Sequence, residues 1–198
     1  MTSVRKTGDW SLASRTLAEA PSKLKRAINT SLMQEAHFLR SLIVKGITAQ
    51  APGGKQFKAL AQNTLITRKL KNFGGEKALM VRADLRNGIS AIVRKGEACV
   101  GVPRKARGKD GKPLVDVAEL NEYGSDPIVI PITPAMRRFL GLLHRESGTR
   151  NRETSGSGVV VTQIPPRPFL RPSFEKFSKG IEKRFLGRVA SIMGMGGK

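Results

Sequence analysis

Residues 21–50 read PSKLKRAINTSLMQEAHFLRSLIVKGITAQ and carry the clearest periodic pattern in the chain. Apolar residues recur there every three or four positions, as on one face of an α-helix: Leu24, Ile28, Leu32, Ala36, Leu39 and Ile43. Ala51-Pro52-Gly53-Gly54 follows, and proline disfavours helix at the residue before it. The pattern predicts one long helix, roughly 40 Å in length at about 1.5 Å per residue. Residues 1–20 lack a period and are expected to form an extended arm.

A second apolar face with the same spacing lies near the C-terminus, at Phe174, Phe177, Ile181, Phe185, Val189 and Ile192. It predicts one last helix, followed by a flexible tail over residues 193–198. Between the two long helices, short helices are expected over residues 63–70, 115–123 and 134–143, with Asn63 or Thr64 capping the first and Thr133 the third. Residues 89–94, 98–102, 128–132 and 159–164 are typical of strands, and the first two form a plausible hairpin.

These elements predict an α+β fold in a single domain over residues 21–192. A small, mostly antiparallel β-sheet would be flanked by the long N-terminal helix and the C-terminal helix. Two basic loops, 103–113 and 144–158, are rich in glycine and polar residues and are expected to be mobile.

The charge is strongly positive: 36 Lys and Arg against 15 Asp and Glu give +21, with a pI near 11.1. Each half of the chain holds 18 of the basic residues, so a basic tail on a neutral domain is excluded. Such a surface must face something anionic or other charged surfaces. The first ten residues are polar and the apolar runs are short, so neither a signal peptide nor a membrane span is expected.

Five cations cluster in the loop over residues 103–113: Arg104, Lys105, Arg107, Lys109 and Lys112. They would neutralise phosphates without reading sequence, or contact an acidic partner. A solvated loop that aids solubility is an equally weighted alternative. Aromatic residues are scarce, which argues against a single-strand binder with stacking platforms.

No pattern in the sequence is typical of an enzyme. Gly53-Gly54-Lys55-Gln56 lacks the spacing of a phosphate loop, so a helix-terminating turn is favoured. Glu119 and Glu122 share a helix face, which indicates a solvated polar surface rather than a catalytic pair. The remaining candidates have bland interpretations: Asp116 and Asp126 as acidic surface, His37 and His144 as packed or surface histidines, and Cys99 as a buried, inert thiol. We therefore expect no catalytic residues, metal or cofactor, and a small hydrolase is a remote alternative.

Several short segments, in order, carry a family resemblance. They are residues 51–65, Lys77-Ala78-Leu79-Met80, Leu85-Arg86-Asn87-Gly88-Ile89, residues 118–124, residues 133–140, and Ile164-Pro165-Pro166-Arg167-Pro168-Phe169-Leu170-Arg171-Pro172-Ser173-Phe174. Together they resemble the tail-completion, or virion-morphogenesis, proteins of tailed bacteriophages over residues 20–190. The Arg-Pro-Phe-Leu element is the most telling of them.

The resemblance implies a non-enzymatic α+β protein that forms a ring, possibly a hexamer, in the virion neck or tail after assembly in the host cytoplasm. Implied partners are further copies of the chain, head-side connector or portal-adaptor proteins, tail tube or tail terminator proteins, and DNA in the channel. The resemblance leaves open whether the protein is a neck, tail-completion or tail-terminator protein. The rival prediction is a freestanding nucleic-acid-binding protein of the ribosomal or nucleoid kind, which explains the charge equally well.

The element Arg167-Pro168-Phe169-Leu170 has an expected mechanical role. Pro168 fixes an extended backbone, while Phe169 and Leu170 would pin the strand-to-helix crossing into the core. Arg167 would pair with an acidic neighbour. Fold packing alone is the favoured interpretation for Phe169 and Leu170.

Overall fold

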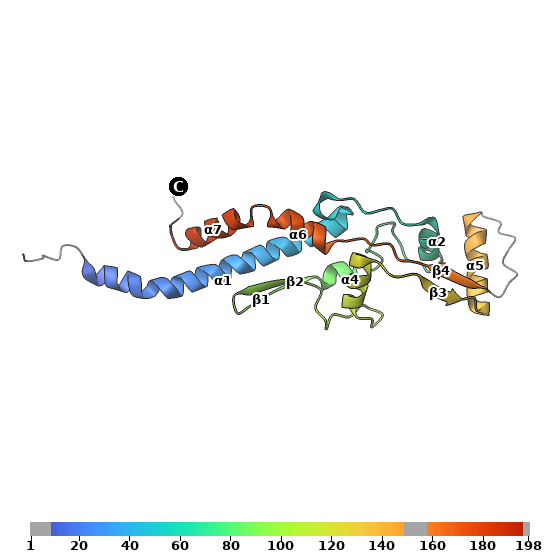
Figure 1. Ribbon diagram of the computed structural model, residues 1–198, viewed down its shortest axis with the longest axis horizontal. Coiled ribbons are helices and arrows are strands. Elements are labelled where there is room, and N and C mark those ends of the chain that lie inside the picture. The colour runs from blue at the N-terminus through green and yellow to red at the C-terminus, as the bar shows by residue number, and fades with distance from the viewer. Residues whose placement is uncertain (1–8, 149–157, 196–198) are drawn as a thin grey trace, which may run out of the picture. The chain divides into compact units, whose positions relative to one another are not determined.

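The computed structural model describes residues 9–148 and 158–195 and has an α+β fold, as predicted (Figure 1). In chain order its elements are α1 (Trp10–Ala49), the 3-10 turn η1 (Pro52–Gly54), α2 (Gln62–Leu70), α3 (Asp84–Gly88), β1 (Ser90–Arg94), β2 (Glu97–Gly101), α4 (Leu114–Tyr123), β3 (Ile128–Pro131), α5 (Pro134–Ser147), β4 (Val159–Thr162), α6 (Leu170–Ser178) and α7 (Ile181–Ile192). No helix in these residues is both long and apolar enough to cross a membrane. Residues 149–157 of the predicted mobile loop and residues 196–198 of the predicted tail lie outside the described residues, and α5 reaches Ser147.

The strands lie where the sequence predicts them but form two sheets instead of one. β1 pairs with β2 across the expected hairpin turn, and β3 pairs antiparallel with β4. In the second sheet Val129 lies opposite Val161 and Ile130 opposite Val160. Each strand has four or five residues, so each sheet is a two-stranded ribbon.

α1 begins earlier than predicted, so the expected extended arm is wrong for residues 10–20; residues 1–8 lie outside the described part. Asp9 starts the helix, because its carboxylate accepts the backbone N–H of Ser11 at 3.1 Å and of Leu12 at 3.0 Å. The first turns are exposed and need no apolar face, which is why periodicity missed them. Pro21 lies inside the helix rather than at its start.

The predicted last helix is two helices. α6 ends at Ser178 and α7 begins at Ile181, with Gly180 between them at a φ of 74°. Glycine adopts this left-handed conformation readily, whereas other residues pay for it. The apolar period runs through the break, so the sequence pattern alone did not indicate it.

The helix caps are as predicted at α5 and differ at α2. The hydroxyl of Thr133 accepts the N–H of Met136 at 3.2 Å, with Pro134 in the first turn. At α2 the N-cap is Ala61, and neither Asn63 nor Thr64 caps the helix.

The chain divides into two compact units, a division that the sequence did not indicate. Unit 1 comprises Met1–His37, Ala91–Cys99 and Gly180–Lys198, and unit 2 comprises Phe38–Ser90 and Val100–Lys179. Unit 2 contains most of the apolar core: Leu39, Ile43, Ile47, Ile66, Ala78, Leu85, Ile89, Leu114, Ala118, Leu143, Phe169 and Phe177 are buried there.

Unit 1 has a small and partly polar core. Among its described residues, Ala27 and Ala36 are the buried apolar ones, beside buried Ser31 and Glu35. The carboxylate of Glu35 lies 3.4 Å from Nη2 of Arg184 and 3.4 Å from Nε of Arg188, two residues of α7. Ion pairing with these two arginines therefore compensates part of the cost of burying the carboxylate.

Candidate functional site

The start of α6 is built around the predicted strand-to-helix element. Phe169 is fully buried, Leu170 is half-buried and Pro168 is exposed. The carboxylate of Glu122 on α4 accepts three backbone N–H groups, from Phe169 at 2.8 Å, Leu170 at 3.0 Å and Arg171 at 2.9 Å. These are donors that the first turn of a helix leaves without partners. A buried carboxylate from another element therefore caps α6 and fixes the crossing.

Glu122 corrects an interpretation made from the sequence. It was predicted to lie on a solvated polar face with Glu119, but only 9% of its surface is exposed, whereas Glu119 is exposed. Its partners lie 47 to 49 positions away in sequence. In the sequence, Glu122 is one acidic residue on an amphipathic helix, a pattern too common to indicate a buried cap.

Arg167 does not pair with an acidic residue within the described part of the chain, contrary to expectation. Its backbone N–H donates to the carbonyl of Asn121 at 2.6 Å. The Nε atom of its guanidinium is buried without a hydrogen-bond partner there. The side chain borders a pocket in unit 2 instead.

That pocket, which we call the Arg68–Arg167 pocket, has a volume of about 400 Å³. Its walls are mainly aliphatic: Leu60, Leu79, Val81, Leu85, Leu114 and Val117 line it. Arg68, from α2, is buried, and its Nη1 donates to the carbonyls of Gly75 and Lys77 at 3.0 and 2.9 Å. Desolvation, and then the nearby charge of Arg167, hold the pKa of Arg68 below its ordinary value.

A third arginine on the pocket is neutralised. Arg82 lies 3.4 Å from Asp84 and 3.4 Å from Asp110, and its guanidinium sits 5.9 Å from the centre of the Phe73 ring. Two other lining residues, Leu79 and Ala83, have φ values of 60° and 58°, a left-handed conformation that costs about 1–2 kcal/mol for a residue with a side chain. The surrounding packing must hold this strained wall in place.

The basic loop 103–113 is folded rather than irregular. Gly108 donates to the carbonyl of Lys112 at 2.9 Å and Leu114 to that of Ala106 at 2.9 Å. The carboxylate of Asp84 accepts the N–H of Lys109 at 3.1 Å. All five predicted contact residues are exposed: Arg104, Lys105, Arg107, Lys109 and Lys112. The loop thus presents its charge to solvent from a hydrogen-bonded base, and Asp110 places that base at the rim of the Arg68–Arg167 pocket.

The other candidate residues differ in exposure. Asp116, Asp126 and His37 are exposed, and His144 is half-buried. Cys99 is exposed, so the prediction of a buried thiol is wrong; it lies in the exposed first part of β2, a strand of a two-stranded sheet. The described residues contain no group of three or more His, Cys, Asp or Glu side chains placed to hold a metal ion.

Gly53 belongs to the turn that ends α1, as the sequence indicated. A Cβ atom on it would lie 2.2 Å from the carbonyl oxygen of Pro172, so only glycine allows this approach between η1 and α6. Lys55 contacts Glu175 at 3.3 Å on the surface. These contacts account for both residues structurally.

An apolar face is exposed on the β3–β4 sheet. Residues opposite one another in an antiparallel pair share a face, and positions two apart do so as well. The register therefore puts Val129, Pro131, Val159 and Val161 on one side. All four are exposed, with Val129 at 59%, Val159 at 59% and Val161 at 62%. We call this the β3–β4 face.

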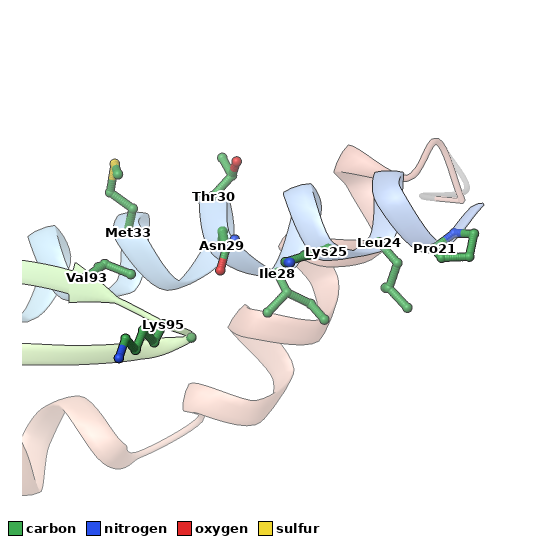
Figure 2. A pocket seen from close by; sticks show the side chains of 10 residues that line it. Pro21, Leu24, Lys25, Ile28, Asn29, Thr30, Met33, Val93 and Lys95 are labelled. Atoms are coloured by element: carbon green, nitrogen blue, oxygen red, sulfur yellow. The ribbon is translucent and has the colours of Figure 1, made fainter. Parts of the chain in front are cut away.

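A groove of about 900 Å³ lies in unit 1, between α1 and the hairpin of β1 and β2 (Figure 2). Leu24 and Ile28 project from the same side of α1, and Lys95 lies at the hairpin tip. Met33 and Leu24, both lining residues, are exposed. We call this hollow the α1 groove.

The sequence matches no protein-family model, no curated protein and no solved structure.

Proposed function

We propose that this protein is a structural component of a tailed-phage virion that assembles into a closed ring at the neck or the tail end. The observation that carries the proposal is the exposed apolar β3–β4 face. The order of short motifs through residues 20–190, including Arg167-Pro168-Phe169-Leu170, supports the phage assignment.

The β3–β4 face favours assembly on physical grounds. An isolated two-stranded sheet is at best marginally stable in water, and one with an apolar side usually needs packing or further strands. Covering exposed valines contributes about 25 cal/mol per Å² of apolar surface removed from water. A second copy of the chain is the occupant we propose for this face.

A ring needs a heterologous contact, in which two different surfaces of the same chain meet around the circle. The α1 groove is apolar along Leu24 and Ile28, and it is separate in sequence from the β3–β4 face. We assign it as the second surface of that contact. Such a contact repeats from subunit to subunit, and the ring closes when the rotation between neighbouring subunits is a whole fraction of a full turn. We expect six subunits.

The remaining partners follow from this placement. The exposed cations of loop 103–113 would contact DNA in the channel or an acidic neighbouring ring. Head-side connector or portal-adaptor proteins and tail tube or tail terminator proteins would lie on either side. The protein would act without catalysis, in the virion, after assembly in the host cytoplasm.

The test is the mass of the assembly, measured by native mass spectrometry and analytical ultracentrifugation for the wild type and two lysine variants. We expect a closed oligomer for the wild type and for Thr162→Lys, which adds the same charge on the opposite side of β4. Val161→Lys should give monomers. A stable monomer both alone and in purified virions would overturn the proposal.

A second candidate function is a freestanding nucleic-acid-binding protein, favoured by the exposure of all five loop cations. Such a protein would bind duplex DNA as a monomer or dimer, with a logarithmic salt slope of about −0.9 for each phosphate neutralised. Replacing all five cations by glutamine should then flatten the slope by up to about 4.5. A ring component should bind weakly while unassembled.

A further inference from the structure

The Arg68–Arg167 pocket combines two arginines with apolar walls, and the function proposed above makes no use of it. Neither Arg68 nor Arg167 forms an ion pair with any carboxylate in the residues that the structure describes. Asp84 and Asp110 reach the same pocket, but both pair with Arg82. Three arginines and two aspartates line the pocket, so its lining carries one net positive charge, and neither Arg68 nor Arg167 has a carboxylate partner among the described residues.

The arginines differ in what they have to offer a ligand. Nη1 of Arg68 is committed to the carbonyls of Gly75 and Lys77, so this residue mainly supplies fixed positive charge. Arg167 is held through its backbone by Asn121, yet its buried Nε has no hydrogen-bond partner among the described residues. This Nε is closed to solvent and so to a ligand, but the two terminal amino groups of the same guanidinium are not buried and form no hydrogen bond with the described residues. They are the donors that Arg167 can offer to an acceptor in the pocket.

The walls select among anions. Inorganic phosphate is usually held by several backbone N–H groups or by a helix N-terminus. Here the arginines face aliphatic side chains, such as Leu79, Leu114 and Val117. A volume of about 400 Å³ is at the small end of the range for ligand sites. Arginine binds carboxylates and phosphates alike through two parallel hydrogen bonds, so the aliphatic walls, rather than the arginines, favour a carboxylate on an apolar body.

We propose that the Arg68–Arg167 pocket binds a carboxylate attached to an aliphatic body, with Arg167 as the residue that recognises the carboxylate. Two sources share this chemistry: a free aliphatic acid, and an acidic side chain next to apolar residues in a peptide. The inference does not depend on ring formation, because every group that it uses lies in unit 2 of a single chain.

The test is calorimetric titration of the full chain with matched probes. Hexanoate represents the free acid, and hexanamide removes only its charge. The peptide acetyl-Leu-Glu-Leu-amide represents the acidic side chain, with the Gln peptide as its neutral match, and inorganic phosphate represents an anion without an apolar body. We expect at least tenfold tighter binding of each carboxylate than of its neutral match, and weaker binding of phosphate than of either. Whichever of hexanoate and the Glu peptide binds with the higher affinity identifies the source of the carboxylate.

Variants then locate the site. Arg167→Gln should weaken carboxylate binding at least tenfold, and Arg167→Lys should fall between it and the wild type. Arg171→Gln is the control, because Arg171 is an exposed arginine of the same segment that contacts Glu175 instead of the pocket. Circular dichroism checks the fold, and if Arg167→Gln is misfolded, the Lys variant decides. Equal binding of hexanoate and hexanamide, phosphate binding as tight as hexanoate, or unchanged affinity in the folded variants would each overturn the proposal.

Discussion

Glu122 shows how one buried side chain determines the join between distant segments. It replaces water as the acceptor for three N–H groups at the start of α6. Phe169, one of the three donors, is fully buried. A carboxylate also stabilises the positive end of a helix dipole. Sequence reasoning identified Phe169 as a core residue but placed Glu122 at the surface, since the partners of a cap on another element cannot be found from local spacing.

Replacing Glu122 by Gln should destabilise the fold by about 2–3 kcal/mol. The amide nitrogen cannot accept an N–H, so at least one donor at the start of α6 loses its partner. Urea unfolding at neutral pH measures the change. Glu119→Gln is the matched control on the same helix and should stay within about 0.5 kcal/mol of the wild type. Equal midpoints for the two variants would contradict this role of Glu122.

Asp9 gives a pH-dependent prediction at the N-terminus of α1. The Ser11 hydroxyl, and then the backbone N–H of Leu12, lower the pKa of Asp9 below the ordinary value of 3.8. Because the folded pKa is depressed, the cap is fully effective above about 3.8 and is lost as pH falls through the lowered value.

NMR of the Ser11 and Leu12 amides between pH 6 and pH 2 should show the first turn fraying only at the acidic end. Asp9→Asn should keep the cap and abolish this pH dependence, since asparagine caps helices about as well as aspartate. Fraying at the same pH in the Asn variant would assign the effect to another group.

At the scale of elements, periodicity predicted nearly every helix and strand but failed where backbone conformation rather than apolar pattern sets a boundary. α1 starts at a polar cap instead of at Pro21, and Gly180 splits the C-terminal helix without interrupting the apolar face. The β1–β2 hairpin is local and was predicted, whereas the pairing of β3 with β4 depends on contacts distant in sequence. Local propensity does not encode such contacts.

Gly53→Ala tests the contact of η1 with α6. Both Gly53 and Gly54 have positive φ, at 62° and 92°, so alanine is strained at either position. Only at Gly53 would the new Cβ meet the Pro172 backbone, whereas at Gly54 nothing lies within 4 Å. Gly53→Ala should therefore cost about 1–3 kcal/mol more than Gly54→Ala in thermal or urea unfolding. Equal costs would mean that η1 and α6 are not in contact in solution.

At the scale of the whole molecule, the two units differ in how much apolar surface they bury. The N-terminal half of α1 belongs to unit 1, where Ala27 and Ala36 are the buried apolar residues among those described. Its C-terminal half contributes Leu39, Ile43 and Ile47 to unit 2. Local opening costs least where few apolar contacts are broken. One continuous helix thus joins regions of unequal stability.

Hydrogen exchange should reveal that difference within α1. Amides of residues 22–36 are expected to exchange at least tenfold faster than those of residues 40–48, despite belonging to the same helix. Mass spectrometry of overlapping peptides, or NMR, measures both segments in one sample. Equal protection along the helix would show that the two halves open together.

The net charge of +21 is a property of the whole molecule, because the basic residues are spread over both halves of the chain. Five of them are exposed on the one folded loop over residues 103–113. Sequence composition predicted a surface that must meet anions. It did not predict the Arg68–Arg167 pocket, where burial and spatial convergence, not the number of cations, create the site.

The exposed thiol of Cys99 has a practical consequence. It is the one cysteine of the chain, so a nitroxide reagent would place a single spin label on every subunit. In a closed ring of such subunits, the ratio of second-neighbour to nearest-neighbour label distances depends only on the number of subunits. Pulsed electron paramagnetic resonance on the labelled protein would therefore count the members of the proposed ring without an image of it.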